Sequence, residues 1–186
     1  MERVWELYHT EFEEIRKPDV HYGRTNADFG QGFYMSDDVE FSVRWAREKR
    51  GSDTIINAYE LDITGLNILK LGRNSEWYEY IYQNRHRRPD AHPEADVIVG
   101  PIANDTIFDT MGITTSGVLS MEQSLPLLLI GPEYRQIVLK SERAAEQLTW
   151  KSSRILSPEE IHQYRDAVAR EEAAFMEKFA SEMAKV

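Results

Sequence analysis

Residues 28–36 read Asp28-Phe29-Gly30-Gln31-Gly32-Phe33-Tyr34-Met35-Ser36. Two glycines followed by apolar and aromatic residues predict a loop that leads into a strand at residues 31–36. Glycine has no Cβ, so a ligand or another backbone segment can come close at Gly30 and Gly32. Upstream, Leu7-Tyr8-His9 ends a strand predicted at residues 4–9. A histidine and a tyrosine on neighbouring strands offer a hydrogen-bonding group and a flat ring, which suits a flat heteroaromatic ligand attached to a sugar.

Composition limits the classes of protein to which the chain can belong. Its 186 residues fit one domain with a sizeable core, and an apolar content of 41% is typical of a globular protein. With 32 acidic against 22 basic residues the formal charge is −10, which repels nucleic acid and anionic membranes at long range. The absence of cysteine excludes disulfides, thiol nucleophiles and cysteine-ligated zinc.

Targeting and metal signals are missing from the sequence. Residues 1–6 hold no apolar core of a signal peptide, and the apolar run at residues 125–130 is too short to cross a bilayer. We therefore expect a cytoplasmic protein without a membrane partner, and delivery into another cell as an effector remains open. The histidines have no metal-ligand spacing, so we expect no metal.

Strands and helices follow one another without regular alternation, which predicts an α+β fold. Further strands are expected at residues 54–61, 67–71, 96–101, 135–140 and 148–150, and helices from Asp37 or Asp38 to about 50, from Ser75, over 104–111, from Ser120 and over 141–147. Ser157-Pro158-Glu159-Glu160 has the residues of a capping box and starts a helix that runs to about residue 184. We divide the chain into a domain at 1–152 and a helical extension at 153–186. We expect this extension to pack on the domain, with a dimer or partner interface as the alternative.

Four segments taken in order resemble the ADP-ribosyltransferase superfamily. They are Leu7-Tyr8-His9, residues 28–34, residues 96–105 and Arg135-Gln136-Ile137-Val138, with the pairs Glu76-Trp77 and Asn84-Arg85 between them. The chain is most similar to an uncharacterised bacterial branch of the diphtheria-toxin and poly-ADP-ribose-polymerase type, whose signature is His, Tyr and then Glu, Asp or Gln. The resemblance covers residues 3–150 and implies split antiparallel β-sheets with peripheral helices and an NAD cleft between the sheets. The long C-terminal helix lies outside it.

The resemblance also implies roles for single residues. His9 would hydrogen-bond the adenosine-side ribose of NAD, Tyr34 would stack on the nicotinamide, and Gln136 would take the place of the catalytic acid. The candidate NAD-binding residues are His9, Thr10, Gly30, Gly32, Phe33, Tyr34 and Asp105. Thr10 stands where the branch more often has glycine.

Glutamine at position 136 changes the expected chemistry. Cleavage of the bond between nicotinamide and ribose develops positive charge on the sugar, which preorganised polar groups stabilise. A glutamine can bind a ribose hydroxyl, but it has no charge and is no base. Transfer would then need an acceptor that is already nucleophilic or an acid elsewhere, with Asp105 and Glu60 as candidates. Elongation to poly-ADP-ribose is not expected.

The implied function is an NAD-dependent mono-ADP-ribosyltransferase, in chemical terms a glycosyltransferase that consumes NAD as substrate. Its acceptor would be a protein, a nucleic acid or a small molecule. Small bacterial enzymes of this kind often act as toxins or effectors, so an antitoxin or immunity protein is a candidate partner. Two alternatives stay open: an NAD glycohydrolase with water as acceptor, and a catalytically inactive NAD- or nucleotide-binding module.

Each of these residues also has a purely structural interpretation. A lone His9 is commonly a strand-end histidine satisfied by the backbone, and a lone Tyr34 is commonly a core residue. The two glycines could form only a turn or bulge. The basic tract at residues 85–88 reads as a solvated helix end that complements the helix dipole, or as a site for a phosphate, a nucleic-acid acceptor or an acidic partner.

Overall fold

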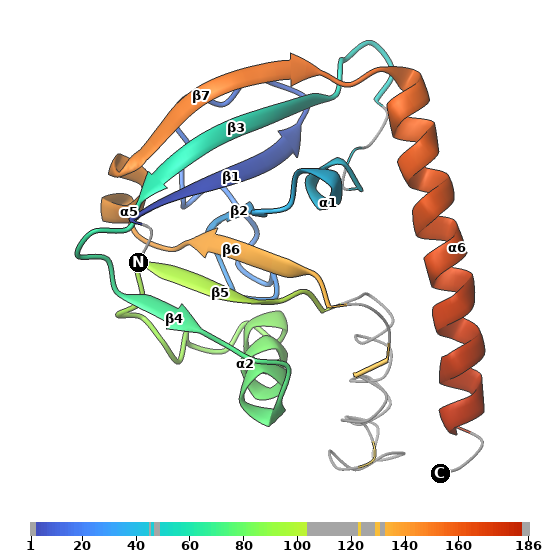
Figure 1. Ribbon diagram of the computed structural model, residues 1–186. Coiled ribbons are helices and arrows are strands. Elements are labelled where there is room, and N and C mark those ends of the chain that lie inside the picture. Colours follow the sequence, from blue (N-terminus) through green and yellow to red (C-terminus); the bar gives the residue numbers. More distant parts are fainter. Residues whose placement is uncertain are drawn as a thin grey trace.

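Two small sheets form the centre of the computed structural model, which describes residues 3–44, 46, 49–103, 123, 129–130 and 133–183 (Figure 1). The first sheet has the order β1-β3-β7, with β1 at Val4–Glu11, β3 at Ile55–Asp62 and β7 at Leu148–Ile155. The second has the order β2-β6-β5-β4, with β2 at Phe33–Met35, β6 at Arg135–Leu139, β5 at Val97–Pro101 and β4 at Ile68–Lys70.

Helices surround the two sheets, so the predicted α+β class is confirmed. They are α1 at Val39–Arg44, α2 at Ser75–Arg85, α5 at Glu142–Glu146 and α6 at Pro158–Met183, and α6 stands along one side of the molecule (Figure 1). The sheet pairs are antiparallel except for β4 and β5, which run parallel. This parallel pair follows from the connection through α2, because a crossover helix returns the chain to the same end of the sheet.

The two sheets meet edge to edge at β1 and β2. Tyr8 and Ser36 exchange backbone hydrogen bonds of 2.8 Å and 3.0 Å there, so the strands follow the sequence β7-β3-β1-β2-β6-β5-β4 down the molecule (Figure 1). A core that includes Leu7, Phe33 and Tyr59 fills the space between the sheets. A second core packs α2 against the other face of the second sheet.

The element boundaries agree best where local signals are strong. The buried run predicted at residues 96–101 forms β5, in which every residue is buried. Ser157 and Glu160 form the expected capping box at the start of α6, with bonds of 2.9 Å and 3.2 Å. Because β7 continues to Ile155, the helical extension begins at Pro158.

Other boundaries differ from the prediction. The described part of α1 ends at Arg44, well before residue 50, and Lys49 and Ser52 form a β-bridge around Gly51, whose φ is +78°. The sequence also suggests Ser75 as the cap of α2, but Ser75 is its first helical residue; the cap is Asn74, whose side chain accepts a bond from the Trp77 backbone N–H. The helices expected over 104–111 and from residue 120 lie outside the described residues.

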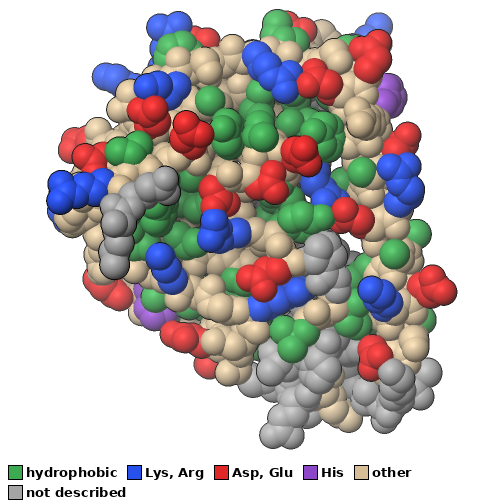
Figure 2. Space-filling model, viewed as in Figure 1, with side chains coloured by type: hydrophobic (Ala, Val, Ile, Leu, Met, Phe, Trp, Pro, Cys, Tyr) green, Lys and Arg blue, Asp and Glu red, His purple; other side chains and the backbone are tan. Residues whose placement is uncertain are grey.

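Charged and hydrophobic side chains both occur across the visible surface (Figure 2). Acidic and basic side chains are interspersed on the face seen in Figure 2. Among the described residues, no helix combines the length and the apolar character that crossing a membrane requires.

Candidate functional site

His9 lies on β1, directly after the residue that joins the two sheets. Its ring Nδ1 is 2.7 Å from the main-chain oxygen of Tyr34 on β2. A carbonyl oxygen only accepts, so in the neutral ring Nδ1 carries the proton and Nε2 is left as an acceptor. Burial lowers the pKa of His9, opposed by the bond to Tyr34 and by the charge of Glu11. The ring is therefore neutral at pH 7, with a defined tautomer.

Phe33 supports the His9 ring from the core between the sheets. The two ring centroids are 4.5 Å apart, and Phe33 also meets the ring of Tyr59 edge-on at 5.9 Å. Side chains alternate along a strand, so Phe33 and Tyr34 face opposite sides of the second sheet. Phe33 thus packs behind His9, whereas the Tyr34 ring projects toward the face that α2 covers.

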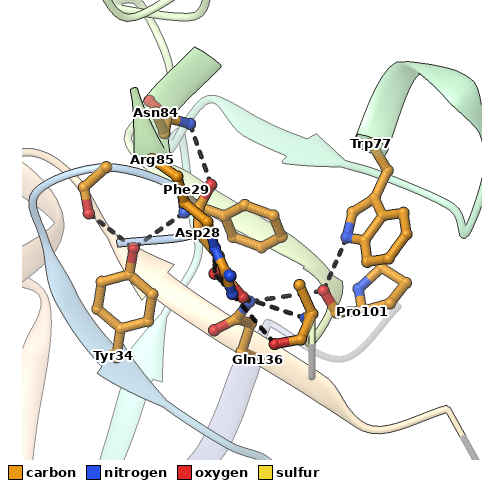
Figure 3. Close-up of polar contacts among 10 residues, drawn as sticks. Asp28, Phe29, Tyr34, Trp77, Asn84, Arg85, Pro101 and Gln136 are labelled. Carbon is orange, nitrogen blue, oxygen red and sulfur yellow. Dashed lines mark hydrogen bonds and ion pairs between the residues drawn. The ribbon is translucent and has the colours of Figure 1, made fainter. Parts of the chain in front are cut away.

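Tyr34 is held by the loop that precedes its own strand. Its hydroxyl donates to the Gly30 carbonyl at 2.6 Å and accepts from the Phe29 backbone N–H at 3.0 Å (Figure 3). Burial, followed by the charge of Asp28, raises the pKa of Tyr34, so the phenol stays protonated. The Tyr34 hydroxyl therefore has its hydrogen-bond partners within the protein, and only the Tyr34 ring can contact a ligand.

Gln136 shares the Tyr34 face of the second sheet. Tyr34 pairs with Val138 on β6, and Gln136 lies two residues before Val138. The Gln136 amide Nε2 donates to Asp28 Oδ2 at 3.3 Å and lies 3.5 Å from the Pro101 oxygen (Figure 3). Both neighbours accept hydrogen bonds, so Nε2 faces them and Oε1 is left as the acceptor end. The residue is only 3% exposed.

A buried ion pair between Asp28 and Arg85 stands beside Gln136, and the sequence interpretation missed it. Arg85 on α2 approaches Asp28 Oδ1 with Nη2 at 2.6 Å and Nε at 2.8 Å, and the two side chains are only 10% and 12% exposed. Asp28 Oδ2 also accepts the backbone N–H of Ala103 at 3.1 Å. For Arg85, the interpretation as a solvated helix end is wrong. The two residues are 57 positions apart, and no local spacing pattern pairs charges at such a separation.

Gly30 and Gly32 allow other parts of the protein to approach the loop closely. A Cβ at Gly32 would lie 2.6 Å from the Leu139 carbonyl oxygen and 2.6 Å from a Val138 methyl group. Gly30 has a φ of +73°, which side chains of L-residues rarely adopt, and a Cβ there would lie 3.0 Å from Lys140 Nζ.

Thr10 connects β1 to α1. Its hydroxyl donates to the Ser42 carbonyl at 2.7 Å, and the residue is buried. Glycine, which the branch more often has at this position, could not make this bond. Thr10 therefore fixes α1 next to His9.

Of the two candidate substitute acids, Glu60 does not lie near Gln136. Glu60 alternates with the buried Tyr59 and Leu61, so it lies on the outer face of β3, where it pairs with Lys151 at 3.0 Å. This placement excludes Glu60 as a partner of Gln136. Asp105 lies outside the described residues. The carboxylate that contacts Gln136 is Asp28, and Arg85 neutralises it.

Metal ligands do not gather in the part of the chain that the structure describes: no three His, Asp or Glu side chains there could together hold an ion. The candidate residues around β2 lie on two faces. The His9 imidazole packs on Phe33 on the face between the sheets, whereas the Tyr34 ring, the Gln136 amide and the Asp28–Arg85 pair lie on the face that α2 covers. The first face offers a hydrogen-bond acceptor, and the second offers an amide and a flat ring.

Comparison with known proteins identifies a family. The model of the family described as "Protein of unknown function (DUF3990)" matches residues 5–150. This segment includes both sheets except for Val4 of β1 and residues 151–155 of β7, and it excludes α6. No curated protein matches the chain.

Proposed function

The chain belongs to the DUF3990 family, and from the site built by the matched segment we propose that it is an NAD-dependent mono-ADP-ribosyltransferase. The reaction breaks the bond between the nicotinamide nitrogen and C1′ of the ribose. Nicotinamide leaves as a neutral molecule with the bonding electron pair. A nucleophilic atom of the acceptor forms a new bond to C1′ and loses a proton. We further propose that the protein works in the cytoplasm as a bacterial toxin or effector, with an antitoxin or immunity protein as partner.

One observation carries this proposal. The His9 ring on β1 is 2.7 Å from the backbone oxygen of Tyr34 on β2, at the place where the two sheets meet, and Gln136 lies on the Tyr34 face of the adjacent strand β6. The His, Tyr and Gln residues of the resemblance thus occupy three successive strands. Because the His9 and Tyr34 side chains lie on opposite faces, NAD would have to contact both of them across the edge between β1 and β2. The segment of the resemblance, residues 3–150, nearly coincides with the matched segment, residues 5–150.

The local chemistry assigns a task to each of the three residues. Nε2 of neutral His9 accepts a hydrogen bond from a ribose hydroxyl, because its tautomer is fixed by the bond to Tyr34. The Tyr34 ring offers planar contact to nicotinamide at low entropic cost. Oε1 of Gln136 accepts a hydroxyl of the second ribose as charge develops on that sugar. Gln136 is buried, so this contact requires the cluster around Asp28 to open when NAD binds.

A second candidate is an NAD-binding module that does not catalyse transfer. It is favoured by the state of Gln136, whose amide is engaged by Asp28, while Asp28 is itself neutralised by Arg85. The catalytic centre would then lack both a base and a free negative charge among the described residues that contact Gln136. Binding of NAD without release of nicotinamide is the signature of this candidate.

The test uses the full chain with NAD labelled in the adenylate, in the presence of a bacterial lysate. Free nicotinamide and label on macromolecules are both measured, with His9→Ala as the inactive variant and the exposed His86→Ala as its control. We expect release of nicotinamide and labelling, lost in His9→Ala and kept in His86→Ala. Release with only free ADP-ribose would identify a glycohydrolase instead. Calorimetry that detects no binding of NAD would reject both candidates.

A further inference from the structure

A small cavity lies between the loop at residues 20–31, the end of α2 and the residue that follows β6. Its volume is about 260 Å³. Of the candidate NAD-binding residues, Gly30 lines it, whereas His9, Tyr34 and Gln136 do not, so the cavity lies beside the candidate NAD site.

Lys140 forms the floor of this cavity. Its side chain is 9% exposed, and its ammonium group donates to the Phe29 carbonyl at 2.5 Å and pairs with Asp90 Oδ2 at 3.1 Å. An ammonium has three donors, so one remains after these two contacts. Gly30 lines the cavity beside Lys140, and a Cβ at Gly30 would stand 3.0 Å from Nζ. The glycine therefore keeps the approach to the ammonium group open.

Asp90, the acidic residue of the cavity wall, is occupied by protein donors. Its Oδ1 accepts the Tyr80 hydroxyl at 2.8 Å and the His92 backbone N–H at 2.9 Å, and its Oδ2 faces Lys140. These bonds, with the Lys140 charge, hold the pKa of Asp90 below its ordinary value although burial opposes this. The charges of Asp90 and Lys140 cancel, so Asp90 does not make the cavity acidic.

Arg88 gives the cavity its excess positive charge. It lies exposed at the rim, with its guanidinium 5.7 Å from the centre of the Tyr82 ring, and it forms no ion pair with a described residue. Thr25 and His21 add a hydroxyl and an imidazole to the same wall. The lining side chains thus present donors and a net charge of +1, from Lys140 and Arg88 against Asp90, in a chain whose overall charge is −10. The exposed Glu142, which does not line the cavity, lies 3.6 Å from His21 Nε2.

We propose that this cavity binds a phosphate group, with Arg88 at the rim and Lys140 at the floor. A guanidinium matches two phosphate oxygens at once, and a buried ammonium supplies a point charge to a third. The volume is too small for a typical drug-sized ligand but suits a phosphate with a short substituent. Inorganic phosphate and a phosphate monoester share this chemistry. Within the basic tract at residues 85–88, Arg88 would thus bind a ligand, whereas Arg85 has a structural role in the ion pair with Asp28.

The test is a titration of ¹⁵N-labelled protein followed through the backbone amides of Gly30, Gln31 and Arg88. Inorganic phosphate and glycerol 3-phosphate are added in separate arms, with sodium chloride at matched ionic strength as the blank. We expect saturable shifts below about 10 mM ligand that the blank does not reproduce. Tighter binding of the monoester would identify a phosphorylated molecule as the ligand, and equal or weaker binding would identify free phosphate.

Two surface variants decide whether the cavity is responsible. Arg88→Gln should weaken binding about tenfold or more, because it removes a charge-assisted pair of hydrogen bonds. Arg87→Gln removes the same charge from a neighbouring exposed residue that does not line the cavity, and it should change the affinity less than about twofold. Equal loss in both variants, or shifts that the chloride blank reproduces, would overturn the proposal.

Discussion

The side-chain amide of Gln136 donates to the carboxylate of Asp28 at 3.3 Å, and Arg85 holds the other oxygen of that carboxylate. The three side chains carry no net charge together. A glutamate at position 136 would place a second carboxylate against Asp28 in a buried setting. The glutamine is therefore matched to Asp28, and the acidic residue of the cluster stands on the loop before β2 instead of on β6.

Gln136→Glu should destabilise the fold by about 2–4 kcal/mol at pH 7, because it leaves an unpaired charge in a buried cluster. Asp28→Asn should also destabilise it, because Arg85 loses its partner. The double variant Asp28→Asn with Gln136→Glu restores the net charge. We expect it to be more stable than the sum of the two single effects by about 1 kcal/mol or more, measured by urea unfolding. If the effects of the two single variants on the free energy of unfolding simply add, the contact between Gln136 and Asp28 does not contribute to stability.

Gly32 is the tightest backbone contact of the loop. Gly32→Ala should cost about 2–3 kcal/mol, because its Cβ would lie 2.6 Å from the Leu139 carbonyl oxygen, which cannot move without disturbing β6. Gly72→Ala is the matched control, since its nearest neighbour, Asn74 Nδ2, would be 3.8 Å away and in ordinary contact. The control should change stability by less than about 0.5 kcal/mol. Similar thermal midpoints for both variants would contradict the close approach at Gly32.

His9 should make stability depend on pH in the weakly acidic range. Its pKa in the folded state lies below the ordinary value of 6.5, mainly because of burial. As the pH falls below 6.5, the unfolded chain takes up a proton at His9 that the folded chain resists, so the contribution of neutral His9 is lost toward the folded pKa. Nitrogen-detected NMR should find a midpoint below 6.5 and, above it, a proton on Nδ1. A midpoint above 6.5 would contradict the burial of the His9 ring, and a proton on Nε2 would contradict the bond to Tyr34. His9→Gln assigns the resonance.

Local signals explain which parts of the fold could be predicted. The β5 strand is an unbroken apolar run that ends at Pro101, and α6 starts with a capping box, so each element is specified by adjacent residues. The end of α1 was misplaced because the apolar periodicity continues beyond Arg44, whereas the turn around Gly51 belongs to the next strand connection. Neither the parallel pairing of β4 nor the edge contact between Tyr8 and Ser36 has a local pattern.

The candidate site likewise has residues that the sequence predicts and partners that it does not. His9, Tyr34 and Gln136 were predicted from ordered short segments, and the structure brings His9 against the Tyr34 backbone and Gln136 onto the Tyr34 face. The partners that fix them, Asp28 with Arg85 and Phe29 with Lys140, are separated by 57 and 111 residues. Contacts at such separations arise from the packing of whole elements, so a single sequence contains no periodicity that reports them.

Glu171 attaches α6 to the residues on either side of the site. Its carboxylate accepts bonds from Arg44 at the end of α1, at 2.6 Å and 3.1 Å, and from the hydroxyl of Tyr134, two residues before Gln136, at 2.8 Å. Arg44 is also 4.5 Å from the centre of the Tyr134 ring. The pKa of Glu171 is lowered, chiefly by the hydrogen bonds from Arg44. This helix lies outside the segment that matches the family, yet it contacts the last residue of α1 and the residue before β6.

Glu171→Gln should therefore destabilise the protein by about 0.5–1 kcal/mol at pH 7, a value discounted because the Glu171 side chain is 41% exposed to screening solvent. The neighbouring exposed Glu172→Gln removes the same charge and should have almost no effect. A carboxyl with a lowered pKa stabilises the fold above its ordinary value of 4.5 and loses this effect as the pH falls through the folded value. The difference between the two variants in thermal unfolding should thus be present at pH 7 and shrink as the pH falls below 4.5. A difference that is absent at pH 7, or unchanged in acid, would mean that the contact with Arg44 and Tyr134 does not hold α6 in place.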